Sequence, residues 1–114
     1  MFNYFERQYE NKLYLDLNVI FERKKNKELN LTSILNSINK TPLKQLTINS
    51  EGNIENSVSS IQIDFANSYI GGGVLSTGIL QEEIRFITSP ECLISILLFE
   101  KLEKNEVAII YGTE

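Results

Sequence analysis

The chain has 114 residues, a formal net charge of −4, one cysteine and no histidine. This length suits a single domain, and 42% apolar with 23% charged residues favours a folded chain. One cysteine excludes an internal disulfide, and the lack of histidine excludes histidine-dependent triads and the usual zinc sites. The acidic balance argues against electrostatic nucleic-acid binding. We therefore expect no metal, no cofactor and no direct contact with DNA.

The N-terminal segment carries charge early and lacks the apolar stretch of a secretory signal. No apolar run approaches the roughly 20 residues that a membrane-spanning helix needs. These features predict an intracellular protein, in the nucleus, the cytoplasm or both. It is expected neither to be secreted nor to bind a membrane.

The first half of the chain is predicted to begin with a helix and to continue mainly as strands. Phe2, Phe5, Tyr9 and Leu13 recur at steps of three and four, which predicts a short amphipathic helix between residues 1 and 16. Alternating apolar and polar residues predict strands further on. The elements expected here are strands at 17–23, 43–49 and 60–66, a short helix at 33–38, a loop at 24–30 and a turn at 50–53.

The second half is predicted to contain two helices and a final strand. Apolar residues recur at Leu80, Ile84 and Ile87, which predicts a helix over 80–88. Ser89-Pro90-Glu91 resembles the start of a second helix. The apolar run Val107–Tyr111 is typical of a buried parallel strand. The order predicts an α/β fold with a mixed sheet flanked by helices and a short N-terminal helix.

The first candidate site is the segment from Asp64 to the glycines Gly71, Gly72 and Gly73. Glycine allows positive φ and close approach of backbone to a ligand, and successive N–H groups in such a loop can bind an anion. The alternative for a bare triple glycine is an ordinary turn. The spacing is neither that of a Walker A loop nor GxGxxG.

Eight residues beyond the last glycine comes the sequence Gln81-Glu82-Glu83 at a predicted helix start. Acidic residues are favoured there by the helix dipole alone, so a solvated helix end is the ordinary interpretation. The functional interpretation is a carboxyl pair for glycosidic chemistry, in which one member protonates a leaving oxygen. A neighbouring carboxylate would raise the pKa of that acid, and the helix N-terminus would lower it.

The stretch GGGVLSTGILQEE resembles the signature of poly(ADP-ribose) glycohydrolases, a triple glycine followed by a short spacer and QEE. DFAN before it, EEIRF overlapping its end and the terminal GTE are similar to the same family. Upstream, NYFER, VIFERK and EGNIE resemble the family in order. The resemblance implies a macrodomain-like α/β fold and hydrolysis of the ribose–ribose bond of poly(ADP-ribose).

The resemblance also implies roles for individual residues. Glu83 matches the general acid, Glu82 the neighbour that holds the substrate ribose, and Asp64 a third acid at the edge of the site. Gln81 would shape the site around the acids. The residues expected to bind the substrate match a ribose contact, the diphosphate loop and a segment near the adenine: Asn67; Gly71, Gly72 and Gly73; Ile54 and Glu55.

By the same resemblance, residues 1–16 would be a remnant of a helical accessory region, and 17–114 the N-terminal half of the catalytic domain. A tyrosine-rich segment follows GTE in the family, so these 114 residues alone are expected to be a poor enzyme. The expected partners are poly(ADP-ribose) or ADP-ribose, with poly(ADP-ribosyl)ated proteins met indirectly, as in polymer breakdown after DNA damage. The alternatives are a non-catalytic ADP-ribose-binding macrodomain fragment and an inactive gene remnant.

Overall fold

The computed structural model describes residues 2–10, 18–26, 30–38, 42, 44–57 and 59–113. The chain divides into two compact units, one made of residues 1–25 with 64–114 and the other of residues 26–63. The first unit contains both strands and all the helices that follow residue 80. No helix in the described ranges is long and apolar enough to cross a membrane.

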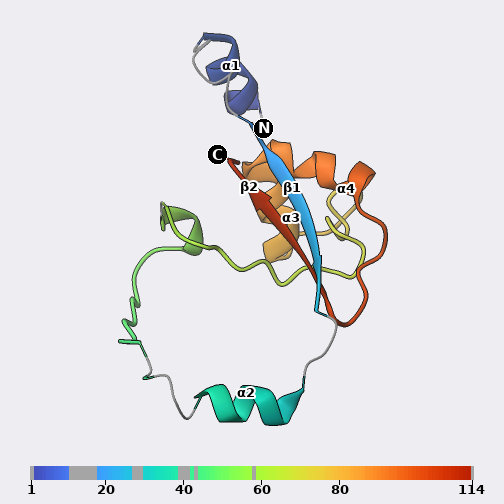
Figure 1. The fold of residues 1–114 in the computed structure, drawn as a ribbon. Coiled ribbons are helices and arrows are strands. Elements are labelled where there is room, and N and C mark those ends of the chain that lie inside the picture. The colour runs from blue at the N-terminus through green and yellow to red at the C-terminus, as the bar shows by residue number, and fades with distance from the viewer. Residues whose placement is uncertain are drawn as a thin grey trace. The chain divides into compact units, whose positions relative to one another are not determined.

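The sheet of the first unit joins the two distant ends of the chain. Strand β1 (Ile20–Lys25) pairs antiparallel with β2 (Glu106–Tyr111), so that Ile20 faces Tyr111 and Lys25 faces Glu106 (Figure 1). A strand over Val107–Tyr111 is confirmed, but its prediction as a buried parallel strand is wrong. An apolar run indicates that a segment is buried, but it does not indicate whether the neighbouring strand is parallel or antiparallel. Here even the burial is incomplete, because Val107 is 51% exposed.

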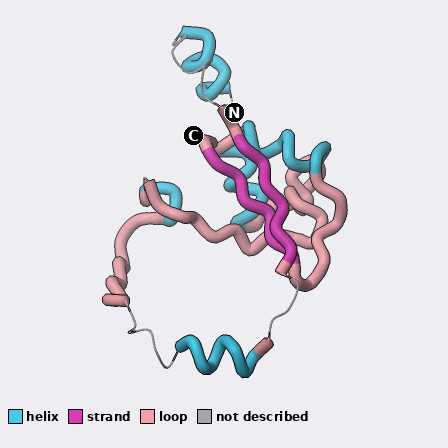
Figure 2. The backbone as a smooth tube through the Cα atoms, viewed as in Figure 1, coloured by secondary structure: helices cyan, strands magenta, loops and turns pink. Residues whose placement is uncertain are grey.

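Three short helices cover one face of this strand pair. They are α3 (Gln81–Thr88), the 3₁₀ helix η3 (Pro90–Ile94) and α4 (Ser95–Leu98). The predicted helix over 80–88 is confirmed, with Leu80 as its N-cap. Pro90 occupies the first turn of the next helix, where its missing N–H costs nothing. Figure 2 shows the long loop that leads into α3.

The core of the first unit lies between these helices and β2. Ile70, Phe86 and Cys92 are buried, and partly buried side chains from the helices and the strand pack against them: Val74, Leu93, Ile96, Phe99, Leu102, Ala108 and Ile110. Phe21 of β1 meets Phe99 edge to face, with ring centroids 6.4 Å apart. Burial raises the pKa of the Cys92 thiol, as expected for a small packing residue.

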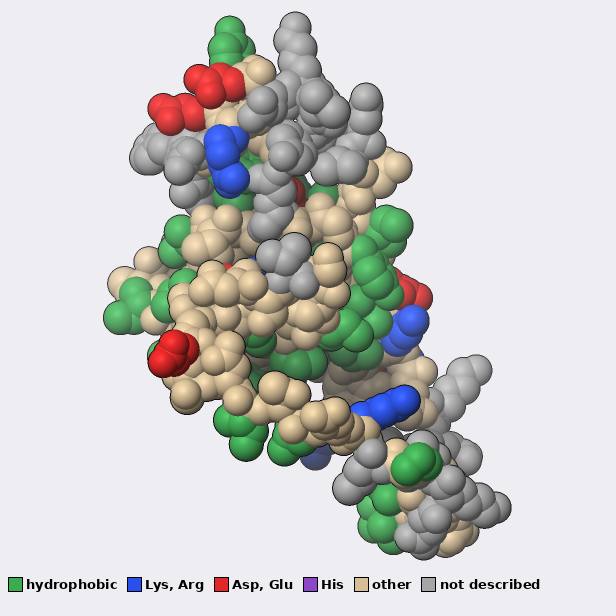
Figure 3. All heavy atoms as spheres, turned by 90° about the vertical axis from the view of Figure 1, so that its left-hand side faces the viewer, with side chains coloured by type: hydrophobic (Ala, Val, Ile, Leu, Met, Phe, Trp, Pro, Cys, Tyr) green, Lys and Arg blue, Asp and Glu red, His purple; other side chains and the backbone are tan. Residues whose placement is uncertain are grey.

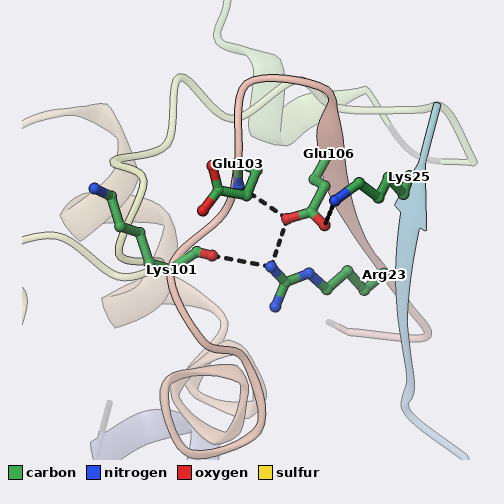
Figure 4. Close-up of polar contacts among 5 residues, drawn as sticks. All are labelled: Arg23, Lys25, Lys101, Glu103 and Glu106. Atoms are coloured by element: carbon green, nitrogen blue, oxygen red, sulfur yellow. Dashed lines mark hydrogen bonds and ion pairs between the residues drawn. The ribbon is translucent and has the colours of Figure 1, made fainter. Parts of the chain in front are cut away.

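A cluster of charged side chains lies at the end of the strand pair where β1 ends and β2 begins (Figure 4). Glu106 accepts hydrogen bonds from Arg23 and from the Glu103 N–H, the latter at 2.9 Å, and forms an ion pair with Lys25 at 3.4 Å. Arg23 also donates to the Lys101 carbonyl at 2.9 Å. The predicted loop at 24–30 therefore starts later than expected, because Lys24 and Lys25 belong to β1.

Two predicted strands are not formed. Residues 44–49 and 60–66 have no helix or strand assignment; residue 43 lies outside the described ranges. A segment with alternating apolar residues forms a strand only if a neighbouring segment bonds to its backbone groups and covers its apolar face. Ile61 and Phe65 are 90% and 83% exposed, and Figure 3 shows hydrophobic side chains reaching the surface.

Of the helices before residue 60, the first two agree with the sequence predictions, whereas the third was not predicted. Helix α1 covers Phe2–Glu10, and the rest of the predicted helix, at 11–16, lies outside the described residues. In the second unit, α2 covers Leu31–Ile38, and the Asn30 carboxamide accepts from the Thr32 N–H at 3.1 Å as an N-cap. The 3₁₀ helix η2 (Ile54–Asn56) follows a turn at Gly52.

Candidate carboxylate site at the glycine loop

Two charged side chains in the first turn of α3 are buried. Glu82 is 5% exposed and Glu83 is 6% exposed, although neither forms an ion pair with a described residue. A buried carboxylate is costly unless hydrogen bonds replace its hydration. All four oxygens of this pair have such a bond, and every donor is a backbone N–H.

Glu82 binds two points of the loop that precedes α3. Its Oε1 accepts from the Gly71 N–H at 2.6 Å, and its Oε2 accepts from the Asn67 N–H at 2.9 Å. Bonds to a charged acceptor are short and strong. Glu82 therefore holds both ends of the segment from Asn67 to Gly71 against the start of the helix.

Glu83 binds the loop and its own helix. Its Oε1 accepts from the Gly73 N–H at 2.8 Å, and its Oε2 accepts from the Leu80 N–H at 2.8 Å. The second contact is the return half of a capping box. The hydrogen bonds from Gly73 and Leu80 lower the pKa of Glu83 below its ordinary value, so this carboxyl is ionised at neutral pH.

Gln81 and Asn67 support the same loop. Gln81 Oε1 accepts from the Phe65 N–H at 2.9 Å, and Asn67 Oδ1 accepts from the Tyr69 N–H at 3.0 Å. The three consecutive side chains of QEE thus anchor backbone positions from 65 to 73. This explains why an otherwise irregular segment is held in one conformation against α3.

The triple glycine is shaped by these carboxylates. Gly71 and Gly72 have φ of +91° and +49°, where a side chain is disfavoured. A Cβ on Gly72 would lie 2.5 Å from Glu83 Oε1 and 2.7 Å from Glu82 Oε2. The Gly72 N–H donates to the Tyr69 carbonyl at 3.1 Å, so all three glycine N–H groups have acceptors within the chain.

Asp64 is the acid of the site whose hydrogen bonding is incomplete. Its side chain is partly buried, and its Oδ1 is enclosed with no donor among the described residues. Burial, and then the nearby charge of Glu82, raises the pKa of Asp64 to about 6. Asp64 therefore keeps its proton up to a higher pH than Glu83 does.

The structure brings eight of the ten predicted site residues into the first unit: Asp64, Asn67, Gly71, Gly72, Gly73, Gln81, Glu82 and Glu83. The other two, Ile54 and Glu55, lie on η2 in the second unit. Sequence reasoning missed Gly78, which packs against Glu83. A glycine in the spacer was the only signal. Within the described ranges, no group of three or more acidic or cysteine side chains could hold a metal ion.

Comparison with known proteins identifies relatives of this loop and helix. A family model described as poly(ADP-ribose) glycohydrolase (PARG), macro domain fold, matches residues 33–114. Poly(ADP-ribose) glycohydrolase 1 of Caenorhabditis elegans is 48% identical over 59 residues, which is 52% of this chain and 8% of that protein. Poly(ADP-ribose) glycohydrolase 1 of Arabidopsis thaliana is 45% identical over 56 residues, which is 49% of this chain and 10% of that protein.

A further relative covers more of the chain. Probable poly(ADP-ribose) glycohydrolase 2 of Arabidopsis thaliana is 39% identical over 75 residues, which is 65% of this chain and 14% of that protein. The matched region thus spans only a small part of each relative. The family model nevertheless matches well over half of this chain and confirms the resemblance carried by GGGVLSTGILQEE. The chain therefore belongs to the poly(ADP-ribose) glycohydrolase family, whose fold is the macro domain.

Proposed function

We propose that this chain carries the catalytic carboxylates of a poly(ADP-ribose) glycohydrolase, which hydrolyses ribose–ribose O-glycosidic bonds and releases ADP-ribose. The observation that carries the proposal is the pair of buried carboxylates, Glu82 and Glu83, held against a glycine loop by backbone N–H groups. Burying two adjacent charges at one helix end costs stability, and functional sites are where such costs are accepted. The family of the chain supplies the reaction.

Glu83 is proposed as the general acid, which protonates the leaving ribose oxygen and then assists the attacking water. The Gly73 N–H lowers the pKa of Glu83, so Glu83 would have to gain its proton when substrate binds. A diphosphate that took over the Gly73 N–H would remove this bond and add negative charge nearby. Both changes raise a carboxyl pKa, so substrate binding would generate the acid.

The other residues are proposed to hold the substrate. Glu82 would orient the ribose next to the scissile bond, and Asn67 would contact a ribose. Asp64 offers an enclosed oxygen that has no donor in the part of the chain that the structure describes, which suits a ribose hydroxyl at the edge of the site. Gln81 fixes the loop through its bond to the Phe65 N–H.

The glycines Gly71, Gly72 and Gly73 are proposed to bind the diphosphate through their backbone N–H groups, because backbone without a Cβ can approach a ligand closely. Ile54 and Glu55 would lie near the adenine. The polymer itself is the proposed partner, and modified proteins would be met through it, in the nucleus, the cytoplasm or both. The proposed domain division is an accessory remnant at 1–16 followed by part of the catalytic domain at 17–114.

One observation favours a second candidate, a non-catalytic ADP-ribose-binding fragment. Every oxygen of Glu82 and Glu83 is already bonded to a backbone N–H, and the lowered pKa of Glu83 opposes proton donation. Carboxylates that are bonded in this way can have a purely structural role, in which they shape a loop that binds the ligand. The two candidates differ in whether bound polymer is cleaved.

The test combines binding with cleavage. ADP-ribose is titrated into the ¹⁵N-labelled chain, and we expect the amide signals of Gly71, Gly72 and Gly73 to shift while those of the α2 residues do not. AMP and ribose 5-phosphate serve as controls for each half of the ligand. Poly(ADP-ribose) is then added, and released ADP-ribose is measured by chromatography. Binding with release supports the glycohydrolase, binding without release supports the second candidate, and no binding overturns both.

A further inference from the structure

We infer that Gly78 is a positioning residue for Glu83, and that its missing side chain makes the space in which the Glu83 carboxylate sits. This inference rests on the proposed function of Glu83. A Cβ on Gly78 would lie 2.6 Å from both Cδ and Oε1 of Glu83 and 2.7 Å from its Cγ. Three successive atoms of one side chain thus run along the Gly78 backbone.

The requirement for glycine at this position is one of space and not of backbone conformation. The glycines with positive φ are Gly52, Gly71, Gly72 and Gly112, and Gly78 is not among them. An alanine could therefore adopt the Gly78 backbone without strain of its own. The alanine Cβ would, however, displace the Glu83 side chain from its present position.

Gly78 is itself fixed to the glycine loop. Its N–H donates to the Gly73 carbonyl at 3.0 Å, and a Cβ on Gly73 would lie 3.1 Å from the Gly78 Cα and N. The two backbones therefore close the turn by packing directly on each other. Glu83 is enclosed between this closed turn and the start of α3.

Glu83 has little freedom to move aside. Its Oε1 is bonded to the Gly73 N–H and its Oε2 to the Leu80 N–H, and both bonds depend on the present place of the carboxylate. A methyl group at residue 78 would push the carboxylate off at least one of these donors. Because those bonds lower the pKa of Glu83, their loss should be visible as a rise in that pKa.

The experiment compares Gly78→Ala with Thr77→Ala, a change at the exposed neighbouring position. The Glu83 carboxyl pKa is followed by ¹³C NMR. We expect it to rise toward the ordinary value in Gly78→Ala and to stay lowered in Thr77→Ala. In a protein that cleaves the polymer, kcat should fall by about 100-fold while the Kd for ADP-ribose changes by less than about threefold. An unchanged pKa in Gly78→Ala would overturn the inference.

A second pair of variants covers the case in which Gly78→Ala folds poorly. Glu83→Asp shortens the side chain by one methylene, so adding Glu83→Asp to Gly78→Ala should restore melting temperature, although Glu83→Asp alone lowers it. A double variant no more stable than Gly78→Ala would contradict the proposed contact. The pKa and stability measurements hold whether or not the chain cleaves polymer, so failure of the proposed function would appear separately, as a wild-type protein that releases no ADP-ribose from the polymer.

Discussion

Oε1 of Glu82 accepts the N–H of Gly71 at 2.6 Å, and this buried bond joins the first residue of the triple glycine to the first turn of α3. Glu82 Oε2 completes the connection through Asn67 at 2.9 Å. The side chain proposed to hold the substrate is therefore also the one that holds the loop. Changes at Glu82 should affect folding and ligand binding together.

Glu82→Gln should destabilise the fold by about 1–3 kcal/mol. The amide keeps one oxygen acceptor, so either the Gly71 or the Asn67 N–H loses its partner within a buried site. Urea unfolding at neutral pH measures this loss, with Glu100→Gln as a control at an exposed position. Equal unfolding free energies in the two variants would show that the bonds from Glu82 are not what holds the loop.

Glu83→Gln separates the proposed acid from its neighbour. If Glu83 donates the proton, turnover of poly(ADP-ribose) should fall by about 10²–10⁴-fold, because the amide cannot act as an acid. ADP-ribose affinity should stay within a few-fold. Glu82→Gln should instead weaken both affinity and turnover. Small and equal losses in both variants, measured as released ADP-ribose, would refute the assignment of roles.

Gly72→Ala should cost more stability than Gly52→Ala. Both glycines have positive φ, so alanine carries a backbone penalty of about 1–2 kcal/mol at either position. At Gly52 the nearest atom to a new Cβ is Asn56 Nδ2 at 3.6 Å, whereas at Gly72 two carboxylate oxygens lie within 2.7 Å. The difference between the two unfolding free energies measures the clash with Glu82 and Glu83. A difference of zero would mean that the loop adjusts freely.

Asp64 should make stability fall as pH rises through mild acidity. Its pKa is raised from the ordinary 3.8 to about 6, so between these values the folded state holds a proton that the unfolded state has lost. The stabilising effect is complete below pH 3.8 and disappears as pH passes about 6. Asp64→Asn should flatten unfolding free energy between pH 4.5 and 7. A wild-type profile that is already flat there would contradict the raised pKa.

Glu106 should act in the opposite direction at lower pH. Its pKa is lowered from 4.5 to about 2, first by the Glu103 N–H and then by Arg23, so its stabilising effect is present above pH 4.5 and lost as pH falls toward 2. Glu106→Gln should lower the urea midpoint at pH 7 and weaken the fall toward pH 2. Glu103→Gln removes the same charge nearby and should do neither. A steep acid transition that survives Glu106→Gln would assign it to other groups.

The helix at 81–88, the loop of glycines before it and the last strand could be predicted from the sequence, because each depends on local chemistry. Apolar spacing predicts that α3 is a helix, although Leu80, Ile84 and Ile87 are exposed and the buried side chains are Glu82, Glu83 and Phe86. Consecutive glycines favour a loop, and Pro90 suits a first helical turn. The family could also be predicted, because GGGVLSTGILQEE carries it in consecutive residues.

Only the tertiary structure decided how those pieces are used. Pairing of β1 with β2 joins residues at opposite ends of the chain, and no local pattern specifies an antiparallel partner so far away. The alternating segment around Phe65 pairs with no strand in the described ranges, and the Phe65 N–H donates to the Gln81 side chain instead. The state of each carboxyl was decided by which N–H groups the folded loop directs at it: Glu83 is held ionised, whereas Asp64 Oδ1 has no donor among the residues that the structure describes. The same packing requires Gly78 to leave room beside Glu83.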